Sequence, residues 1–178
     1  MFTRMDKGTA EDWAHIAEKH KPHIEAMPDR IINMLKELKN IQGGFAVDQL
    51  EHSLQTATRA RKAGEFDEMI LLCLIHDIGK VISVIGHAEI AAEIVKAYVS
   101  EDIYEALKHH QDFQGKYYYH YMGKETDLRK IHRYDEWYDI CVKFVDKYDM
   151  VAFDPKYKSD SLESFIPLIQ KTFKKPRL

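Results

Sequence analysis

The sequence has few cysteines, glycines and prolines. Of its 178 residues, two are cysteine, eight are glycine and five are proline. Two cysteines could form at most one disulfide, but Cys73 lies within an apolar segment and is expected to be a small buried hydrophobic residue. This cysteine usage favours a reducing compartment, so we expect a cytoplasmic location.

The sequence also lacks long hydrophobic runs. No segment approaches the ~20 apolar residues that a membrane-spanning helix needs. Residues 1–7 lack the apolar stretch of a signal peptide. We therefore expect no membrane partner.

The sequence also has no excess of positive charge. The net charge of -3 argues against nucleic-acid binding through phosphate contacts. Apolar residues make up 45% and charged residues 31% of the chain, as in an ordinary globular protein. A chain of this length can form one domain with a substantial core. We expect a small-molecule partner and no nucleic acid, and the sequence makes no prediction about the oligomeric state.

Between the glycines and prolines, apolar residues recur at helical spacing. The predicted helices cover residues 9–19, 29–40, 47–63, 66–80, 87–99, 101–111 and 136–151. No stretch sustains the alternation of a strand, although the tyrosine-rich residues 117–121 fit a short strand, a loop or a helical segment. We therefore predict an all-α, single-domain helical bundle. Residues 1–40 are expected to be a helical extension packed on the core domain of residues 41–178.

The adjacent pair His76-Asp77 follows the apolar run of residues 69–75. A buried carboxylate without a partner costs several kcal/mol or more, so Asp77 is expected to be paired or bound to a metal. His76 shares a helical stripe with Leu72 and Cys73 and is expected to face inward. The pair therefore predicts a metal site built from several helices.

Helical periodicity also indicates further candidate residues for the metal site. His87 opens a helix whose inward stripe includes Ala91. Of two adjacent histidines, His110 continues the apolar face of the helix 101–111, whereas His109 falls on the solvent side.

The last helix offers two aspartates. Asp149 extends the apolar stripe of the helix 136–151, while Asp146 lies near its more polar face, so Asp149 is favoured. His52 lies on a mixed, polar stripe that fits either a pocket wall or an exposed face. The remaining histidines are interpreted as surface residues (His15, His20, His23 and His132), except that His120 is interpreted as structural or at the edge of a pocket.

These segments resemble the HD superfamily of metal-dependent proteins, which is named for its adjacent His-Asp pair. The matching elements are Gln49 to Gln55 around His52, His76-Asp77-Ile78-Gly79-Lys80, Gly86-His87-Ala88-Glu89, Lys108-His109-His110 and Lys147-Tyr148-Asp149. They occur in the family's order, and the similarity runs from about Gly43 to Phe153, which is most of the chain. The resemblance implies that residues 41–178 form an HD domain.

Within the superfamily, the chain looks most similar to the mixed-valent di-iron oxygenases of the myo-inositol oxygenase and phosphonate-cleaving type. The resemblance implies two iron ions, Fe(II) and Fe(III), with the ligands His52, His76, Asp77, His87, His110 and Asp149. Asp77 would bridge the irons. The implied activity uses O2 to cleave a C–P or C–C bond of a small hydroxylated, anionic substrate such as a 1-hydroxyphosphonate.

The chain departs from the phosphonate-cleaving branch before its first implied ligand. That branch has a Tyr-x-x-Glu element, whereas this chain has Gln42-Gly43-Gly44-Phe45. The Phe45 ring is expected to contact an apolar substrate group or a quaternary ammonium. Lys80 resembles the substrate-holding lysine of the inositol enzyme, and Gln49 is the third residue expected to contact substrate.

Two other functions remain open at this stage. An HD-type phosphohydrolase would use the same ligands with manganese or another divalent metal, which lowers the pKa of an attacking water. A third possibility is a non-catalytic HD module that binds a ligand.

Overall fold

The computed structural model describes residues 1–177, and all secondary structure within that range is helical. The α-helices are α1 (Ala10–Glu25), α2 (Met27–Glu37), α3 (Gln49–Lys62), α4 (Asp67–Ile75), α5 (His87–Val95), α6 (Glu101–Tyr118), α7 (Tyr138–Lys143) and α8 (Leu162–Phe173). Short 3-10 helices form at Met5–Lys7, Leu38–Asn40, Ile78–Val81, Tyr119–Met122 and Leu128–His132, and a π-helical turn at Phe144–Asp149. The predicted all-α bundle is confirmed.

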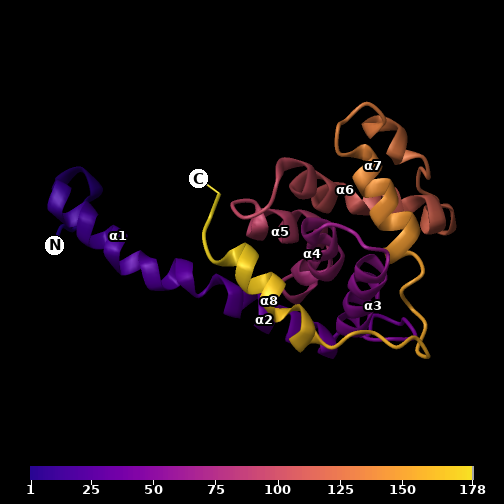
Figure 1. Cartoon of the computed structure of the whole chain (residues 1–178). Helices are drawn as coiled ribbons and strands as arrows, with labels where there is room; N and C mark the ends of the chain where they lie inside the picture. Colours follow the sequence, from indigo (N-terminus) through magenta and orange to yellow (C-terminus); the bar gives the residue numbers. More distant parts are fainter. Residues whose placement is uncertain (178) are drawn as a thin grey trace.

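Helix α4 lies at the centre of the bundle (Figure 1). All its residues from Met69 to Ile75 are buried. Helices α3 and α6 pack against it, and α5 packs against α6. Burial on every side is what a helix without a polar face requires, and it explains why the apolar run lacks an amphipathic pattern.

Several helix ends differ from those predicted. The segment predicted as one helix over 66–80 is interrupted, because α4 ends at Ile75 and a 3-10 helix begins at Ile78. Helix α5 ends at Val95 instead of 99. Helix α6 continues to Tyr118, so residues 117–121 are helical and not a strand.

Gly79 explains why the chain can turn so tightly after α4. A Cβ atom at this position would lie 2.1 Å from the carbonyl oxygen of His87. Only glycine permits this close approach between the 3-10 helix Ile78–Val81 and the start of α5. The contact places the His-Asp pair beside His87.

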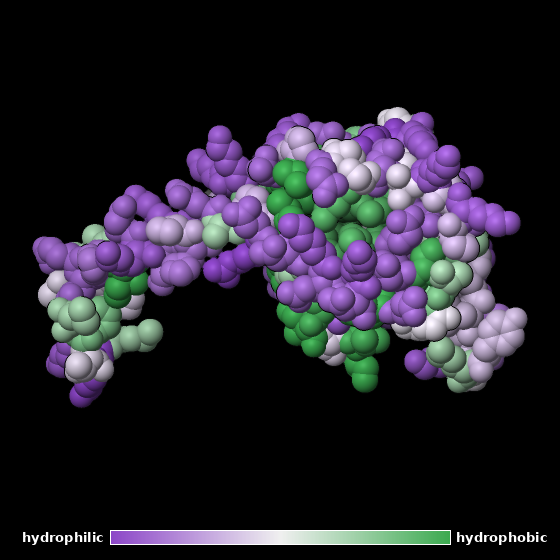
Figure 2. Space-filling model, turned by 90° about the horizontal axis from the view of Figure 1, so that it is seen from below, coloured by the Kyte–Doolittle hydropathy of each residue, from purple (hydrophilic) through white to green (hydrophobic). Residues whose placement is uncertain are grey.

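The two helices of the predicted N-terminal extension differ in their packing. Helix α2 buries Ile31, Ile32 and Leu35 and packs against α8. Helix α1 buries none of its residues and projects from the body, and its surface is mostly hydrophilic (Figures 1 and 2). The expectation that all of residues 1–40 pack on the core is therefore wrong for α1, whose apolar side chains, such as the 44% exposed Trp13, stay in contact with solvent. The boundary at residue 40 stays a prediction.

Two further observations bear on the sequence expectations. Cys73 and Cys141 are both free and buried, so Cys73 packs as a small hydrophobic residue. Over residues 1–177, none of the helices has the length and hydrophobicity needed to cross a bilayer.

Candidate metal centre

Six buried side chains from five parts of the chain meet at one place inside the bundle. Their donor atoms form two groups, and within each group the atoms lie within 4.8 Å of one another. The first group is His52, His76 and Asp149, and the second is Asp77, His87 and His110. None of the six is more than 4% exposed. Each group thus contains two imidazoles and one carboxylate.

Local structure explains how these side chains reach the centre. Asp48 caps α3 by accepting a hydrogen bond from the Glu51 amide at 2.8 Å, which fixes His52 in the first turn. His76 is the C-cap residue of α4, and Asp77 is the N-cap residue of the next 3-10 helix. Because the helix breaks between them, these neighbours reach the same centre instead of pointing about 100° apart.

His87 and Asp149 are presented by two further irregularities. Gly86 precedes α5 with φ 71°, a left-handed conformation that suits glycine, and His87 is the first residue of the helix. Asp149 ends the π-helical turn Phe144–Asp149, which replaces the continuous helix predicted over 136–151. Such turns are frequent at functional sites. Val145, Tyr148 and Asp149 of this segment are all buried.

The four imidazoles share one orientation. Each places Nδ1 within hydrogen-bond distance of a backbone carbonyl oxygen, at 2.6 to 3.1 Å. The carbonyls belong to Ala152 for His52, Cys73 for His76, Val84 for His87 and Leu107 for His110. A carbonyl oxygen only accepts hydrogen bonds, so Nδ1 carries the proton and Nε2 carries the lone pair in each neutral ring. Four Nε2 lone pairs therefore converge on the centre.

The distances between donor atoms are close to those around a bound metal ion. His52 Nε2 lies 3.0 Å from His76 Nε2, and Asp149 Oδ1 lies 3.1 Å and 3.6 Å from these two atoms. Bonds of about 2.1 Å to one ion place neighbouring donors roughly 3.0 to 3.4 Å apart. Eight buried side-chain nitrogen and oxygen atoms within residues 1–177 lack a hydrogen-bond partner, and four of them belong to the centre: Asp77 Oδ1, His87 Nε2, His110 Nε2 and Asp149 Oδ1. These atoms fit metal ions.

Asp77 lies between the two groups. Its Oδ1 is 3.1 Å from His87 Nε2, and its Oδ2 is 3.4 Å from His76 Nε2 and 3.7 Å from His52 Nε2. One carboxylate oxygen thus faces each group. This arrangement allows one carboxylate to bridge two ions.

The electrostatics favour the metal-binding forms of Asp77, Asp149 and His110, whereas for His76 the charge of Asp77 outweighs burial and raises the pKa. Burial alone would raise the pKa of Asp149, but the nearby His52 and His76 outweigh it and lower the pKa to about 2. The pKa of Asp77 is likewise lowered well below its usual value, because His76 and Lys80 outweigh the effect of burial. Burial lowers the pKa of His110 to about 3. At neutral pH the centre therefore holds ionised carboxylates and a neutral His110.

Polar side chains hold the carboxylates in place. Lys80 Nζ donates to Asp77 Oδ2 and to Gln49 Oε1, each at 2.6 Å. Gln114 Nε2 donates to Asp149 Oδ2 at 2.7 Å. The charge of Lys80 partly neutralises Asp77, and both carboxylates are oriented by these contacts.

A cavity of about 500 Å³ opens onto the centre. His52, Asp77, His87 and Asp149 form part of its wall, together with Lys80, Gln111 and Gln114. The rest of the wall is aromatic or apolar and includes Phe45, Tyr118, Met122 and Phe153. Two of the residues expected to contact substrate, Lys80 and Phe45, thus line the cavity. Gln49 is not among the lining residues, and its amide oxygen holds Lys80 instead.

In each pair of neighbouring candidate ligands that were compared by periodicity, the structure places one residue in the centre and the other outside it. His110 points into the centre, while His109 lies on the outer side of α6 near Glu105 and Asp112. Asp149 belongs to the centre, while Asp146 binds Arg129 through a bidentate ion pair. The apolar stripes of α6 and of the segment that ends at Asp149 therefore correctly indicated which faces of these segments point inward.

One interpretation of a histidine was wrong. His132 is 9% exposed, although it was interpreted as a surface residue. Its ring packs against Phe113, Trp137 and His109. The charged neighbours in its own segment concealed this burial, because the covering rings come from other elements. His15, His20 and His23 are exposed, as expected, and His120 is exposed as well.

Sequence reasoning missed Phe153 as part of the site. Its ring stacks on His52 with centroids 4.2 Å apart and on Phe45 with centroids 4.7 Å apart. The three rings form a continuous stack that connects the cavity wall to the centre. Phe153 lies in a loop, so no helical periodicity marked it.

The fold and the centre define an all-helical protein whose buried histidine and aspartate side chains are suited to hold metal ions. The family model for the HD domain matches residues 50–152, which is more than half of the chain and includes all six side chains of the centre. The chain therefore belongs to the HD-domain family, whose members are generally metal-dependent phosphohydrolases or oxygenases. A search of the curated proteins finds no match.

Proposed function

We propose that this protein is a di-iron oxygenase that cleaves a C–P or C–C bond of a small hydroxylated, anionic molecule. The observation that carries the proposal is the composition of the two donor groups, each with two histidines and one carboxylate. This ligand set, with open coordination positions, is typical of non-haem iron sites that react with dioxygen. Bound iron would supply the redox chemistry with O2 at this centre.

The residues of the chain would hold the irons and exclude water. His52, His76 and Asp149 would bind one iron, His87 and His110 the other, and Asp77 would bridge them. The bridge is supported by its two oxygens facing different groups, 3.1 Å from His87 Nε2 and 3.4 Å from His76 Nε2. The aromatic and apolar cavity wall would keep water from the reacting bond.

The cavity suggests how a substrate would be held. Its volume of about 500 Å³ suits a small molecule. Lys80 is the cation of the lining and would bind the anionic group, such as a phosphonate or carboxylate, while keeping its contact with Asp77. Phe45 is 49% exposed and would contact the part of the substrate nearest the solvent. Gln49 would position Lys80 through its hydrogen bond.

Spectroscopy of the iron-loaded protein tests the metal centre directly. Protein purified without oxygen, loaded with Fe(II) and partly oxidised, should contain two irons per chain. It should also give the electron paramagnetic resonance signal of a coupled Fe(II)/Fe(III) pair. Iron that binds only as isolated ions would contradict the proposal.

Turnover tests the reaction class. The loaded protein should consume O2 with at least one member of a panel of 1-hydroxyphosphonates and polyols. A phosphohydrolase is the alternative, because the segment His76-Asp77-Ile78-Gly79-Lys80 resembles both classes. The protein would instead be a phosphohydrolase if it released phosphate from nucleotides with Mn(II) and without O2, and if it took up no O2 with any member of the panel.

A further inference from the structure

A second cluster of metal-binding side chains lies on the outer side of α6, away from the buried centre. His109 and Asp112 come from α6, and His132 ends the 3-10 helix Leu128–His132. One donor atom from each of the three lies within 4.8 Å of the others. None of these residues belongs to the proposed di-iron site.

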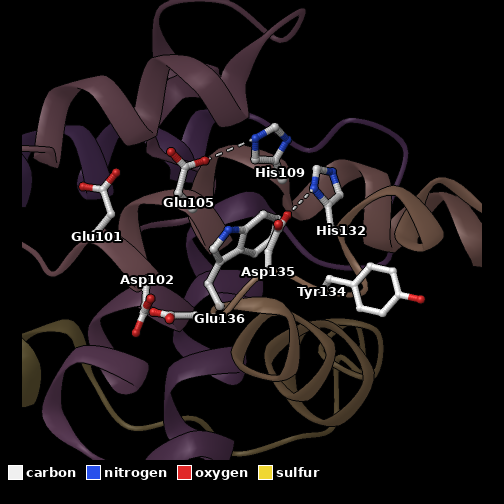
Figure 3. Close-up of a pocket in the computed structure, with 9 residues that line it drawn as sticks. Glu101, Asp102, Glu105, His109, His132, Tyr134, Asp135 and Glu136 are labelled. Carbon is white, nitrogen blue, oxygen red and sulfur yellow. Dashed lines mark hydrogen bonds and ion pairs between the residues drawn. The ribbon is translucent and has the colours of Figure 1, made fainter.

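Two outer carboxylates orient the histidines of this cluster (Figure 3). Glu105 Oε2 lies 3.3 Å from His109 Nε2, and Asp135 Oδ2 lies 3.1 Å from His132 Nδ1. A carboxylate at one ring nitrogen keeps the proton there and leaves the other nitrogen free to bind a metal. The other nitrogens, His109 Nδ1 and His132 Nε2, each lie 3.5 Å from Asp112 Oδ2.

The geometry and the donor types suit zinc. Zinc bonds of about 2.1 Å in a tetrahedron place neighbouring donors roughly 3.4 Å apart, close to the 3.5 Å found on both sides of Asp112. Two imidazoles and one carboxylate form a common set of three zinc ligands, with the fourth position left for water. Stacking of His109 on Trp137, with ring planes 15° apart, restricts the rotation of this ring.

The surroundings favour a cation. The cluster borders an open cavity of about 510 Å³ whose lining includes three further acidic side chains, Glu101, Asp102 and Glu136 (Figure 3). These charges make the local potential negative and raise the local concentration of divalent cations.

We propose that His109, Asp112 and His132 bind one zinc ion. The ion joins the 3-10 helix Leu128–His132 to α6 and thereby fixes the helix that also presents His110 to the buried centre. The site is independent of the metal and reaction at that centre, so either proposal can fail without the other.

Zinc stoichiometry tests this site. The wild type, Asp112→Asn and Asp102→Asn are equilibrated with micromolar Zn(II) at neutral pH, and bound zinc is measured by mass spectrometry of the metal. Asp112→Asn should bind one zinc ion fewer than the wild type. Asp102→Asn removes one negative charge from the cavity beside the cluster without removing a ligand, so it should bind as many ions as the wild type. Equal binding by the wild type and Asp112→Asn, or an equal loss in Asp102→Asn, would overturn the proposal.

Two further measurements guard against misfolding and locate the ion. Asp112 is 33% exposed in its side chain, so the isosteric change to asparagine should leave the circular dichroism spectrum unchanged. His132→Gln is the second variant and should lose the same ion. In a zinc-soaked crystal of the wild type, anomalous scattering at the zinc edge should place a peak between His109 Nδ1, His132 Nε2 and Asp112. A peak only at the buried centre would contradict the proposal.

Discussion

His52 and His76 point their Nε2 atoms at each other across 3.0 Å, while both Nδ1 atoms face backbone carbonyl oxygens. With Nδ1 protonated on both rings, two lone pairs face each other unless a cation lies between them. A proton or a metal ion would satisfy both nitrogens. The two histidines therefore make the centre sensitive to both pH and metal, and this relationship underlies several of the predictions below.

Replacement of Asp77 by alanine should abolish activity and most metal binding. Asp77 is the carboxylate that faces both donor groups, and without it the two ions would lose their shared ligand. We expect iron affinity to fall by more than about tenfold, the lower end of what loss of a supporting residue costs. Iron content after dialysis and the coupled spectroscopic signal measure the effect. An Asp77→Ala protein that retained two irons would contradict the bridging role.

The adjacent residues His109 and His110 form a matched pair for mutation. His110→Ala should lose iron from the buried centre together with activity, because His110 is fully buried with Nε2 aimed at the centre. His109→Ala should retain the iron and its coupled signal, because His109 lies on the other side of α6. Iron analysis of both variants compares the same substitution one residue apart. The opposite result would show that the centre is built differently.

The fold could be predicted because apolar residues at helical spacing mark the faces that pack. The ends of the helices could not, because they depend on contacts between distant residues. The break after Ile75 requires the close approach of Gly79 to His87, and the π-helical turn at Phe144–Asp149 leaves no mark in the apolar pattern.

The same distinction applies to the candidate site. His76, His110 and Asp149 lie on apolar stripes, so periodicity indicated their inward orientation. His52 could be identified only by family resemblance, because α3 buries polar residues such as Gln49, Gln55 and Thr56 around the centre. Burial of polar side chains breaks the rule that buried faces are apolar. Phe153 and His132 pack against rings from other elements, and such contacts cannot be seen in the local sequence pattern.

The stability of the metal-free protein should be highest near pH 6.5. The carboxylate of Asp77 outweighs the effect of burial and raises the pKa of His76 above 6.5. This contribution is complete below pH 6.5 and is lost as the pH rises through the raised pKa. The pKa of Asp149 falls from 3.8 to about 2, so its contribution is present above pH 3.8 and is lost as the pH falls toward 2. Burial lowers the pKa of His110 from 6.5 to about 3, so the unfolded chain takes up this proton more readily and the folded state loses stability as the pH falls below 6.5. The melting temperature should therefore be highest near pH 6.5 and should fall toward both acid and base.

The stabilisation that bound iron gives the protein should increase with pH. Metal binding needs unprotonated Nε2 atoms, so protons compete with iron as the pH falls. The difference in melting temperature between loaded and metal-free protein should grow from about pH 5 to pH 8. Differential scanning calorimetry at several pH values measures both curves. If the melting temperatures of the loaded and the metal-free protein changed in parallel with pH, iron and protons would not compete for these nitrogens.

Lys80→Met should weaken substrate binding more than it affects iron. Methionine keeps much of the length of the side chain but removes the charge that faces the cavity. With the substrate found in the oxygen-uptake panel, we expect KM to rise by about tenfold or more, because a charged hydrogen bond contributes roughly 1.5 to 3 kcal/mol. Iron content is the control. An unchanged KM for an anionic substrate would remove Lys80 from the substrate site.

Gly79→Ala should destabilise the fold at the point that joins the His-Asp pair to α5. The new Cβ would lie 2.1 Å from the His87 carbonyl oxygen, and this atom belongs to the backbone and cannot rotate away. We expect a loss of about 1 to 3 kcal/mol in the free energy of unfolding, as for other overpacked sites. Urea denaturation of the metal-free protein measures it.

Gly64→Ala separates this clash from the general cost of replacing glycine. Gly64 has φ +75° and no atom within 4 Å of an added Cβ, so its replacement strains the backbone without a collision. It should cost about 1 to 2 kcal/mol and leave iron binding unchanged. Gly79→Ala should lower iron affinity as well, because the displaced backbone carries His87. If both variants lost stability equally and both kept iron, the close approach of Gly79 to His87 would have no part in building the centre.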